Sequence, residues 1–242
     1  VITERIKHLI QDKNVDPQEI LALTFTEKAS HEMTERVGDI MPLGYEEPWI
    51  YTFHAFAERL LKEKGIEIGL DPSFKTLPES DQWLLLRKNI FDMDLKYFRP
   101  LGNPTKFISD ILTFISKLQD ENISEKDFEA FVKQMKHESD EEKLKYDELS
   151  YIYNEYERLK LQNSGLDFGN LIMWVIKLFK ERPNILSEYQ KQFKHILLDE
   201  FQDTNYAQYE LIKLLYPTEE EPKEKSELRS LLVVGDDSQS IY

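Results

Sequence analysis

The chain has 242 residues, of which 40% are hydrophobic and 32% charged, and its formal net charge is −15. This length is enough for one large domain or two small ones with a hydrophobic core, and the charge argues against nucleic-acid binding through overall charge alone, although a local groove could still bind it. The absence of cysteine excludes disulfides, thiolate metal sites and a cysteine nucleophile, and it is compatible with a reducing cytoplasm.

No apolar run approaches the ~20 residues that span a bilayer. The first ten residues, VITERIKHLI, have the spacing of an amphipathic helix instead of the pattern of a signal peptide. We therefore expect a cytoplasmic protein without membrane contact. Because the chain starts at Val1 and stops at SQSIY, directly after a strand-like run, we also expect it to be part of a longer protein.

The first 65 residues alternate between helical and strand patterns. We expect helices over 1–13 and 27–37, strands over 20–26 and 49–52, and a further helix that ends near Gly65. The run 20–26 is apolar except for its two threonines, which is typical of a strand buried on both faces of a parallel sheet. Alternating strands and helices predict an α/β fold.

Residues from about 80 to 163 carry helical patterns and no strand pattern, which predicts an all-helical block inserted into the α/β frame. The frame resumes with a helix over 167–181, a strand in HILLDE, a helix in TNYAQYELIKLLY and a strand in RSLLVVGD. We place the domain limits at 1–78, 79–163 and 164–242, and read 217–227 as a charged loop.

Acidic residues follow the strand in HILLDE. Asp199 and Glu200 stand at its carboxyl end, where open α/β sheets bind ligands. A carboxylate there can hold Mg²⁺ through water, and a second can polarise an attacking water. Acids also end strands for purely structural reasons, so the pair alone leaves both readings open.

Polar and aromatic residues follow the other strands. Thr24, Phe25 and Thr26 end one of them, the stretch from Thr52 to His54 ends another, and Gln239 follows the last. Hydroxyls and helix N-termini suit backbone phosphates, and aromatic rings suit stacking on unpaired bases. An uncharged amide such as Gln239 can hydrogen-bond to a γ-phosphate without burying another charge.

The order of these segments resembles that of the superfamily 1 DNA helicases of the UvrD/Rep/PcrA type. LALTFTEKASHEMTERV is similar to their motif Ia and YTFHAFAERLL to motif Ib; LLDEFQDTNYAQYELI resembles motif II, the Walker B box, and LLVVGDDSQSIY motif III. LDFGNLI resembles the segment that re-enters the motor domain. The resemblance implies a partial RecA-like P-loop NTPase sheet, and it implies that the helical block is domain 1B.

The resemblance implies an ATP-dependent 3′-to-5′ DNA helicase or translocase that uses ATP and Mg²⁺, acts on single-stranded DNA and duplex junctions, and works with repair or replication proteins. It implies that Asp199 holds Mg²⁺, that Glu200 activates the hydrolytic water and that Gln239 senses the γ-phosphate. The residues it places at DNA are Thr24, Phe25, Thr26, Thr52, Phe53, His54 and Tyr242. Asp203 is expected to cap or brace a helix that begins near Thr204.

Two departures from the family pattern stand out. No Gly-Lys-Ser/Thr occurs, so the phosphate-binding P-loop is absent, and VITERI resembles the segment just after it. We therefore expect that this chain alone does not hydrolyse ATP. DFGNL replaces the more usual DFDDL, which a helix start on the surface would tolerate.

Other functions remain open. The chain could belong to a helicase–nuclease or a defence-system helicase, or it could be a non-catalytic module that binds DNA or a partner protein. An RNA-directed motor is disfavoured because DEFQDT is unlike the Asp-Glu-Ala-Asp box of those proteins.

Overall fold

The computed structural model describes residues 1–39, 41, 46–217, 229–236 and 238. The chain divides into two compact units, one made of residues 1–69 and 174–242 and the other of residues 70–173. The helical block that the sequence predicts over 79–163 falls within the second unit. None of the described helices combines the length and the apolar content that a membrane crossing requires.

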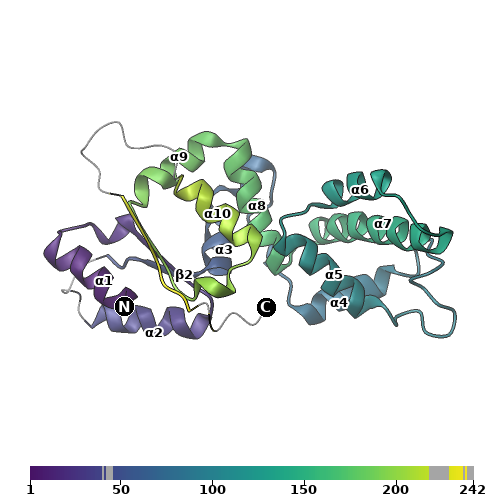
Figure 1. Ribbon diagram of the computed structural model, residues 1–242, viewed down its shortest axis with the longest axis horizontal. Coiled ribbons are helices and arrows are strands. Elements are labelled where there is room, and N and C mark those ends of the chain that lie inside the picture. Colours follow the sequence, from purple (N-terminus) through teal and green to yellow (C-terminus); the bar gives the residue numbers. More distant parts are fainter. Residues whose placement is uncertain (40, 42–45, 218–228, 237, 239–242) are drawn as a thin grey trace. The chain divides into compact units, whose positions relative to one another are not determined.

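A four-stranded parallel sheet with the order β2-β1-β5-β6 forms the centre of the first unit (Figure 1). Its strands are β1 (Ile20–Thr24), β2 (Trp49–Thr52), β5 (His195–Leu198) and β6 (Ser230–Val233). Every residue of β1 is buried, as its apolar run predicts. The predicted extension of β1 to Thr26 is wrong, because the Thr26 hydroxyl already accepts the Ala29 N–H as the N-cap of the next helix.

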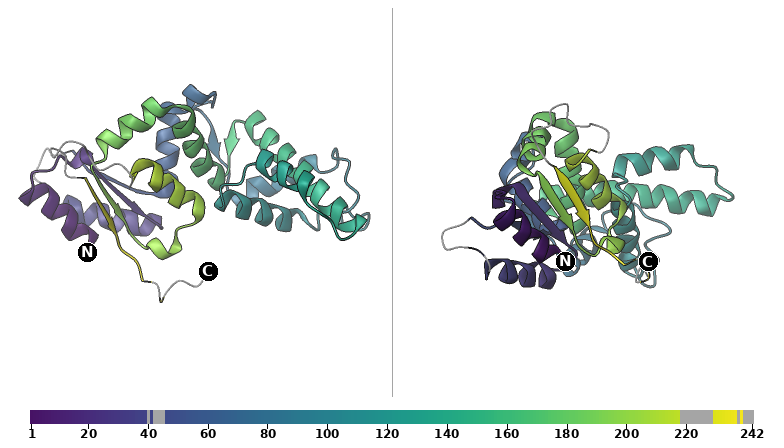
Figure 2. Two further views of the ribbon diagram at one scale, coloured as in Figure 1. Left: turned by 45° about the horizontal axis from the view of Figure 1, so that its top comes forward. Right: turned by 60° about the vertical axis from the view of Figure 1, so that its left-hand side comes forward.

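Helices cover both faces of this sheet (Figures 1 and 2). The first unit contains α1 (Ile2–Lys7), α2 (Glu27–Gly38), α3 (Phe53–Lys64), α9 (Pro183–Gln192) and α10 (Tyr206–Leu215), with short turns η1 (His8–Asp12), η2 (Pro17–Glu19), η3 (Gly65–Ile68) and η4 (Phe201–Asp203). Ala22 and Ile50 pack with residues of α1 and α2. Trp49 lies on the opposite face, with its ring centroid 6.4 Å from that of Phe56 in α3.

Two helical predictions need correction. The helix expected over 1–13 consists of α1 followed by the wider turn η1, which ends at Asp12. Helix α9 was not expected at all. It begins at Pro183, a residue that suits the first position of a helix because its missing N–H has no partner there.

The second unit is built from α4 (Glu79–Asn89), α5 (Ile108–Asp120), α6 (Glu125–Gln134) and α7 (Asp140–Gln162), with a small parallel pair of strands, β3 (Lys75–Thr76) and β4 (Gly165–Leu166). Residues 80–163, all of them described, contain no strand, as predicted. The charged stretch 125–162 forms two helices, because Ser139 caps α7 after a short break. Helix α8 (Phe168–Glu181) runs from this unit into the first.

A buried polar cluster joins α7 to the start of α8. Lys160 is fully buried, with its Nζ 2.8 Å from Glu157 Oε1, and it also contacts Asp167 and Asn170. Burial raises the pKa of Glu157. Burial would also raise the pKa of Asp167, but the Lys160 ammonium and several hydrogen bonds lower it instead. The Lys160 ammonium and the side-chain amides of Gln119 and Asn170 all donate to the Glu157 carboxyl group, and these bonds limit the cost of burying the cluster.

Gly169 makes room for this cluster. The amide of Gln119 enters it, 3.2 Å from Asp167 Oδ2, and a Cβ at Gly169 would lie 2.7 Å from the Cβ of Gln119. Asn170 is only 3% exposed, so the expectation that DFGNL forms a helix start on the surface is wrong. The glycine is explained by the close approach of Gln119.

We expect Gly169→Ala to lower the free energy of unfolding by about 1–3 kcal/mol, because the stem of Gln119 must shift to admit the new methyl group. Urea unfolding of the chain measures this change. Gly38→Ala is the matched control, since Gly38 also lies in a helix and no heavy atom lies within 4 Å of a Cβ there. Alanine is favoured over glycine in a helix by up to about 1 kcal/mol, so a stabilised Gly169→Ala would show that Gln119 moves away at little cost.

Candidate active site

The candidate residues gather where the four parallel strands end. Leu23 pairs with Tyr51 on one side and Leu198 on the other, and Leu198 pairs with Val233. Two backbone bonds of 2.9 Å, from Asp199 N to Leu23 O and from Val234 N to Leu198 O, continue the pairing beyond the strand ends. The next row across the carboxyl edge of the sheet therefore reads Thr52, Thr24, Asp199, Val234.

Asp199 and Glu200 differ in environment. The Asp199 side chain is half-buried, and burial, followed by the charge of Glu200, raises its pKa. Glu200 is exposed and has a left-handed backbone, with φ 50° and ψ 45°. A non-glycine residue in this conformation costs about 1–2 kcal/mol, and such strain is often found at functional sites. The turn ends β5 abruptly and leaves the second carboxylate in solvent.

Gln202, which is not among the residues predicted for the site, contacts Glu200 directly. Its Nε2 donates to Glu200 Oε2 over 2.6 Å, and its Oε1 accepts the Asp236 N–H over 3.0 Å. A polar amide two residues after the acidic pair is the only signal for it in the sequence.

Three residues expected at DNA are buried and make local contacts. Thr24 is fully buried, and its hydroxyl donates to Thr26 O. The Thr52 hydroxyl donates to Glu27 Oε1 and accepts the Ala55 N–H, while Phe53 is only 2% exposed. The hydroxyls are bonded locally and the phenyl ring is in the core, so these side chains offer no contact surface at the edge.

Phe25, Thr26 and His54 remain accessible at the same edge. Phe25 is 48% exposed, Thr26 is exposed at the start of α2, and His54 is half-buried in the first turn of α3. Burial lowers the pKa of His54, and the charge of Glu27 opposes this effect. The Glu27–Thr52 bond ties together the N-termini of α2 and α3, whose helix dipoles favour negative charge.

Other predicted residues are placed as follows. Gln239 and Tyr242 lie outside the described residues. The expectation that Asp203 caps the next helix is wrong. Asn205 is the N-cap of α10 and forms a capping box with Gln208. The Gln208 backbone N–H donates to Asn205 Oδ1, with 2.9 Å between nitrogen and oxygen.

Asp199 is the carboxylate best placed to hold a cation. Among the residues that the structure describes, no group of three or more His, Asp or Glu forms a ready-made metal site. Magnesium keeps much of its water and commonly binds one or two carboxylates together with substrate phosphates. A cation at Asp199 would offset the two effects that raise the pKa of this carboxyl group, its burial and the charge of Glu200.

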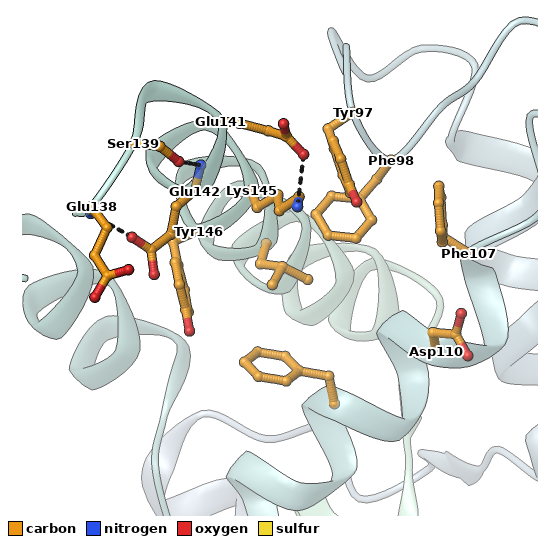
Figure 3. A pocket seen from close by; sticks show the side chains of 12 residues that line it. Tyr97, Phe98, Phe107, Asp110, Glu138, Ser139, Glu141, Glu142, Lys145 and Tyr146 are labelled. Atoms are coloured by element: carbon orange, nitrogen blue, oxygen red, sulfur yellow. Dashed lines mark hydrogen bonds and ion pairs between the residues drawn. The ribbon is translucent and has the colours of Figure 1, made fainter.

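The second unit carries an open cavity of about 680 Å³ with an aromatic and acidic lining (Figure 3). Tyr97 and Phe107 form aromatic walls, and Lys145 lies 2.8 Å from Glu141 with its ammonium 4.5 Å from the centre of the Tyr97 ring. The remaining charged residues of the lining are the carboxylates Asp110, Glu138 and Glu142. An acidic lining repels phosphate, so this cavity is a poor site for a nucleotide or for a nucleic-acid backbone.

Comparison with known proteins gives a consistent picture. Residues 1–242 match the family described as the UvrD/REP helicase N-terminal domain. The chain is 37% identical to the ATP-dependent DNA helicase PcrA of Bacillus subtilis (strain 168) and 35% identical to that of Staphylococcus aureus (strain Mu50 / ATCC 700699). Both matches cover 100% of this chain and 30% of the relative, so the chain spans under a third of the length of these relatives.

We expect Asp199→Asn to stabilise the chain at neutral pH by up to about 1 kcal/mol, because the carboxylate is only partly withdrawn from water. The folded pKa of Asp199 is raised, so its favourable contribution is complete below the unfolded value of 3.8 and is lost as pH rises through the folded pKa. Urea unfolding as a function of pH should therefore show a gain that disappears in acid. The same gain in the exposed control Asp110→Asn would contradict this explanation.

Proposed function

The chain belongs to the UvrD/REP helicase family, and from this premise we propose that the protein carrying it couples ATP hydrolysis to movement along single-stranded DNA. The observation that carries the proposal is the pair Asp199 and Glu200 at the carboxyl end of a buried parallel strand. The 3′-to-5′ direction and action at duplex junctions belong to the same proposal.

In the proposed mechanism, the two carboxylates have separate tasks. Asp199 would hold the magnesium, which would supply charge neutralisation on the phosphates of ATP. Glu200, exposed on its left-handed turn, orients the attacking water and accepts its proton. Gln239, outside the described residues, is proposed to sense the γ-phosphate.

DNA binding is proposed at the adjoining part of the same edge. The Phe25 ring stacks on a base, and Thr26 and His54 lie near the phosphates at the N-termini of α2 and α3. Thr24, Thr52 and Phe53 support this surface from within, and Tyr242 remains a proposed contact outside the described residues. Because the chain has a net charge of −15, stacking and helix N-termini must contribute where overall charge does not.

A second candidate is a non-catalytic module that binds DNA or a partner protein. The 242 residues contain no Gly-Lys-Ser/Thr segment and so do not themselves supply a phosphate-binding loop. Membership of a helicase–nuclease, of a defence system or of a repair or replication complex is compatible with either candidate.

We expect the full-length protein that contains this chain to hydrolyse ATP faster in the presence of single-stranded DNA. Glu200→Gln should lower kcat by about 10²–10⁴-fold, because it removes the base while keeping the shape of the side chain. Steady-state ATPase assays measure this change, with ATP binding as the control. The 242-residue chain alone should give no turnover. Intact DNA binding without any turnover by the full-length protein would support the module instead.

We expect Phe25→Ala to weaken binding of a single-stranded oligonucleotide about fivefold to a hundredfold, the range that corresponds to one lost base-stacking contact. Fluorescence anisotropy on the 242-residue chain measures the affinity. Phe131→Ala is the matched control, since Phe131 is 58% exposed and lies in the second unit. Equal losses in both variants would count against stacking at Phe25.

A further inference from the structure

Gln202 connects the end of β5 to the end of β6 through Asp236, which lies 34 residues further along the sequence. Its amide nitrogen donates to the Glu200 carboxylate over 2.6 Å, and its amide oxygen accepts the backbone N–H of Asp236 over 3.0 Å. The turn after β5 and the segment after β6 therefore share one side chain.

The backbone holds Gln202 in this position. The left-handed turn at Glu200 leads directly into η4, and the Phe201 N–H donates to Val234 O over 3.0 Å. This bond brings the start of η4 against the segment after β6. From this position the Gln202 side chain reaches both Glu200 and Asp236.

Gly235 provides the space for the amide. A Cβ at Gly235 would lie 2.7 Å from Gln202 Oε1, closer than real side chains approach. The backbone nitrogens of Phe201 and Gln202 would be 3.4 Å from the same Cβ, which is an ordinary contact. A side chain at Gly235 would thus displace the Gln202 oxygen with little disturbance of the backbone.

The chemistry of the bridge requires an amide of this length. A primary amide carries a donor and an acceptor at its two ends, whereas an ionised carboxylate only accepts and an alkyl side chain does neither. Gln202 can therefore hold a carboxylate and a backbone N–H at the same time without adding charge.

We propose that Gln202 is a positioning residue that orients the Glu200 carboxylate and ties it to the segment after β6. The proposal rests on the function proposed above for Glu200. A movement of the segment that contains Gly235 and Asp236 then shifts the Gln202 side chain. The shifted side chain changes the orientation of the Glu200 carboxylate, the proposed base.

The first test uses ATPase kinetics of the full-length protein. Gln202→Met keeps the side-chain length and removes both hydrogen bonds, and it should lower kcat about 10- to 100-fold while KM for ATP stays nearly constant. Gly235→Ala should lower kcat to a similar extent, because the new methyl group would displace the Gln202 amide oxygen. Combining the two substitutions should be no worse than Gln202→Met alone. An unchanged kcat in Gln202→Met, or fully additive effects, would overturn the proposal.

The second test measures the bridge without activity. Amide hydrogen exchange in the 242-residue chain should show faster exchange of the Asp236 N–H in Gln202→Met than in the wild type. The Asp199 N–H, which is bonded to Leu23 O, is the internal control and should keep its rate. Equal Asp236 rates in both proteins would contradict the bridge. If the full-length wild type shows no turnover that depends on Glu200, the proposed function fails, and hydrogen exchange still decides whether the bridge exists.

Discussion

The candidate site depends on the pairing of β1 with strands on both sides. Because β1 is buried on both faces, a slip of one residue would turn its apolar side chains to the wrong neighbours along its whole length. Burial therefore fixes the register, and the register fixes the row in which Thr52, Thr24, Asp199 and Val234 lie. The geometry of the polar edge is a consequence of the apolar interior behind it.

The sequence predicts most of this frame because local patterns determine it. The run at 20–23 is uniformly apolar and helical patterns recur from 80 to 163, so the sequence predicts the strand, except for its end, and the helical block. Asp199 and Glu200 could be identified because they follow a buried strand directly. The roles of Thr24 and Thr52 could not be predicted from the sequence. A hydroxyl that bonds to the nearby backbone has the same sequence signature as one that faces a ligand.

Contacts between distant segments could not be predicted. In the sequence, Gly169 reads only as the loss of an acidic residue, and its contact with Gln119 of α5 is not visible. Gln202 reads as an ordinary polar residue, and its hydrogen bond with the Asp236 N–H is not visible either. Each case joins segments more than thirty residues apart. A single sequence contains the residue types of such contacts but not their pairing.

The order of the sheet has a further consequence at β6. Among the described residues β6 pairs only with β5, and its side chains from Ser230 to Leu232 are half-buried while Val233 is exposed. Its outer edge therefore offers unpaired backbone groups next to apolar side chains, a combination that accepts an additional strand. A parallel strand added there would end beside Val234 and Gly235. The loop that followed such a strand would begin at the same carboxyl edge of the sheet as the turn at Glu200.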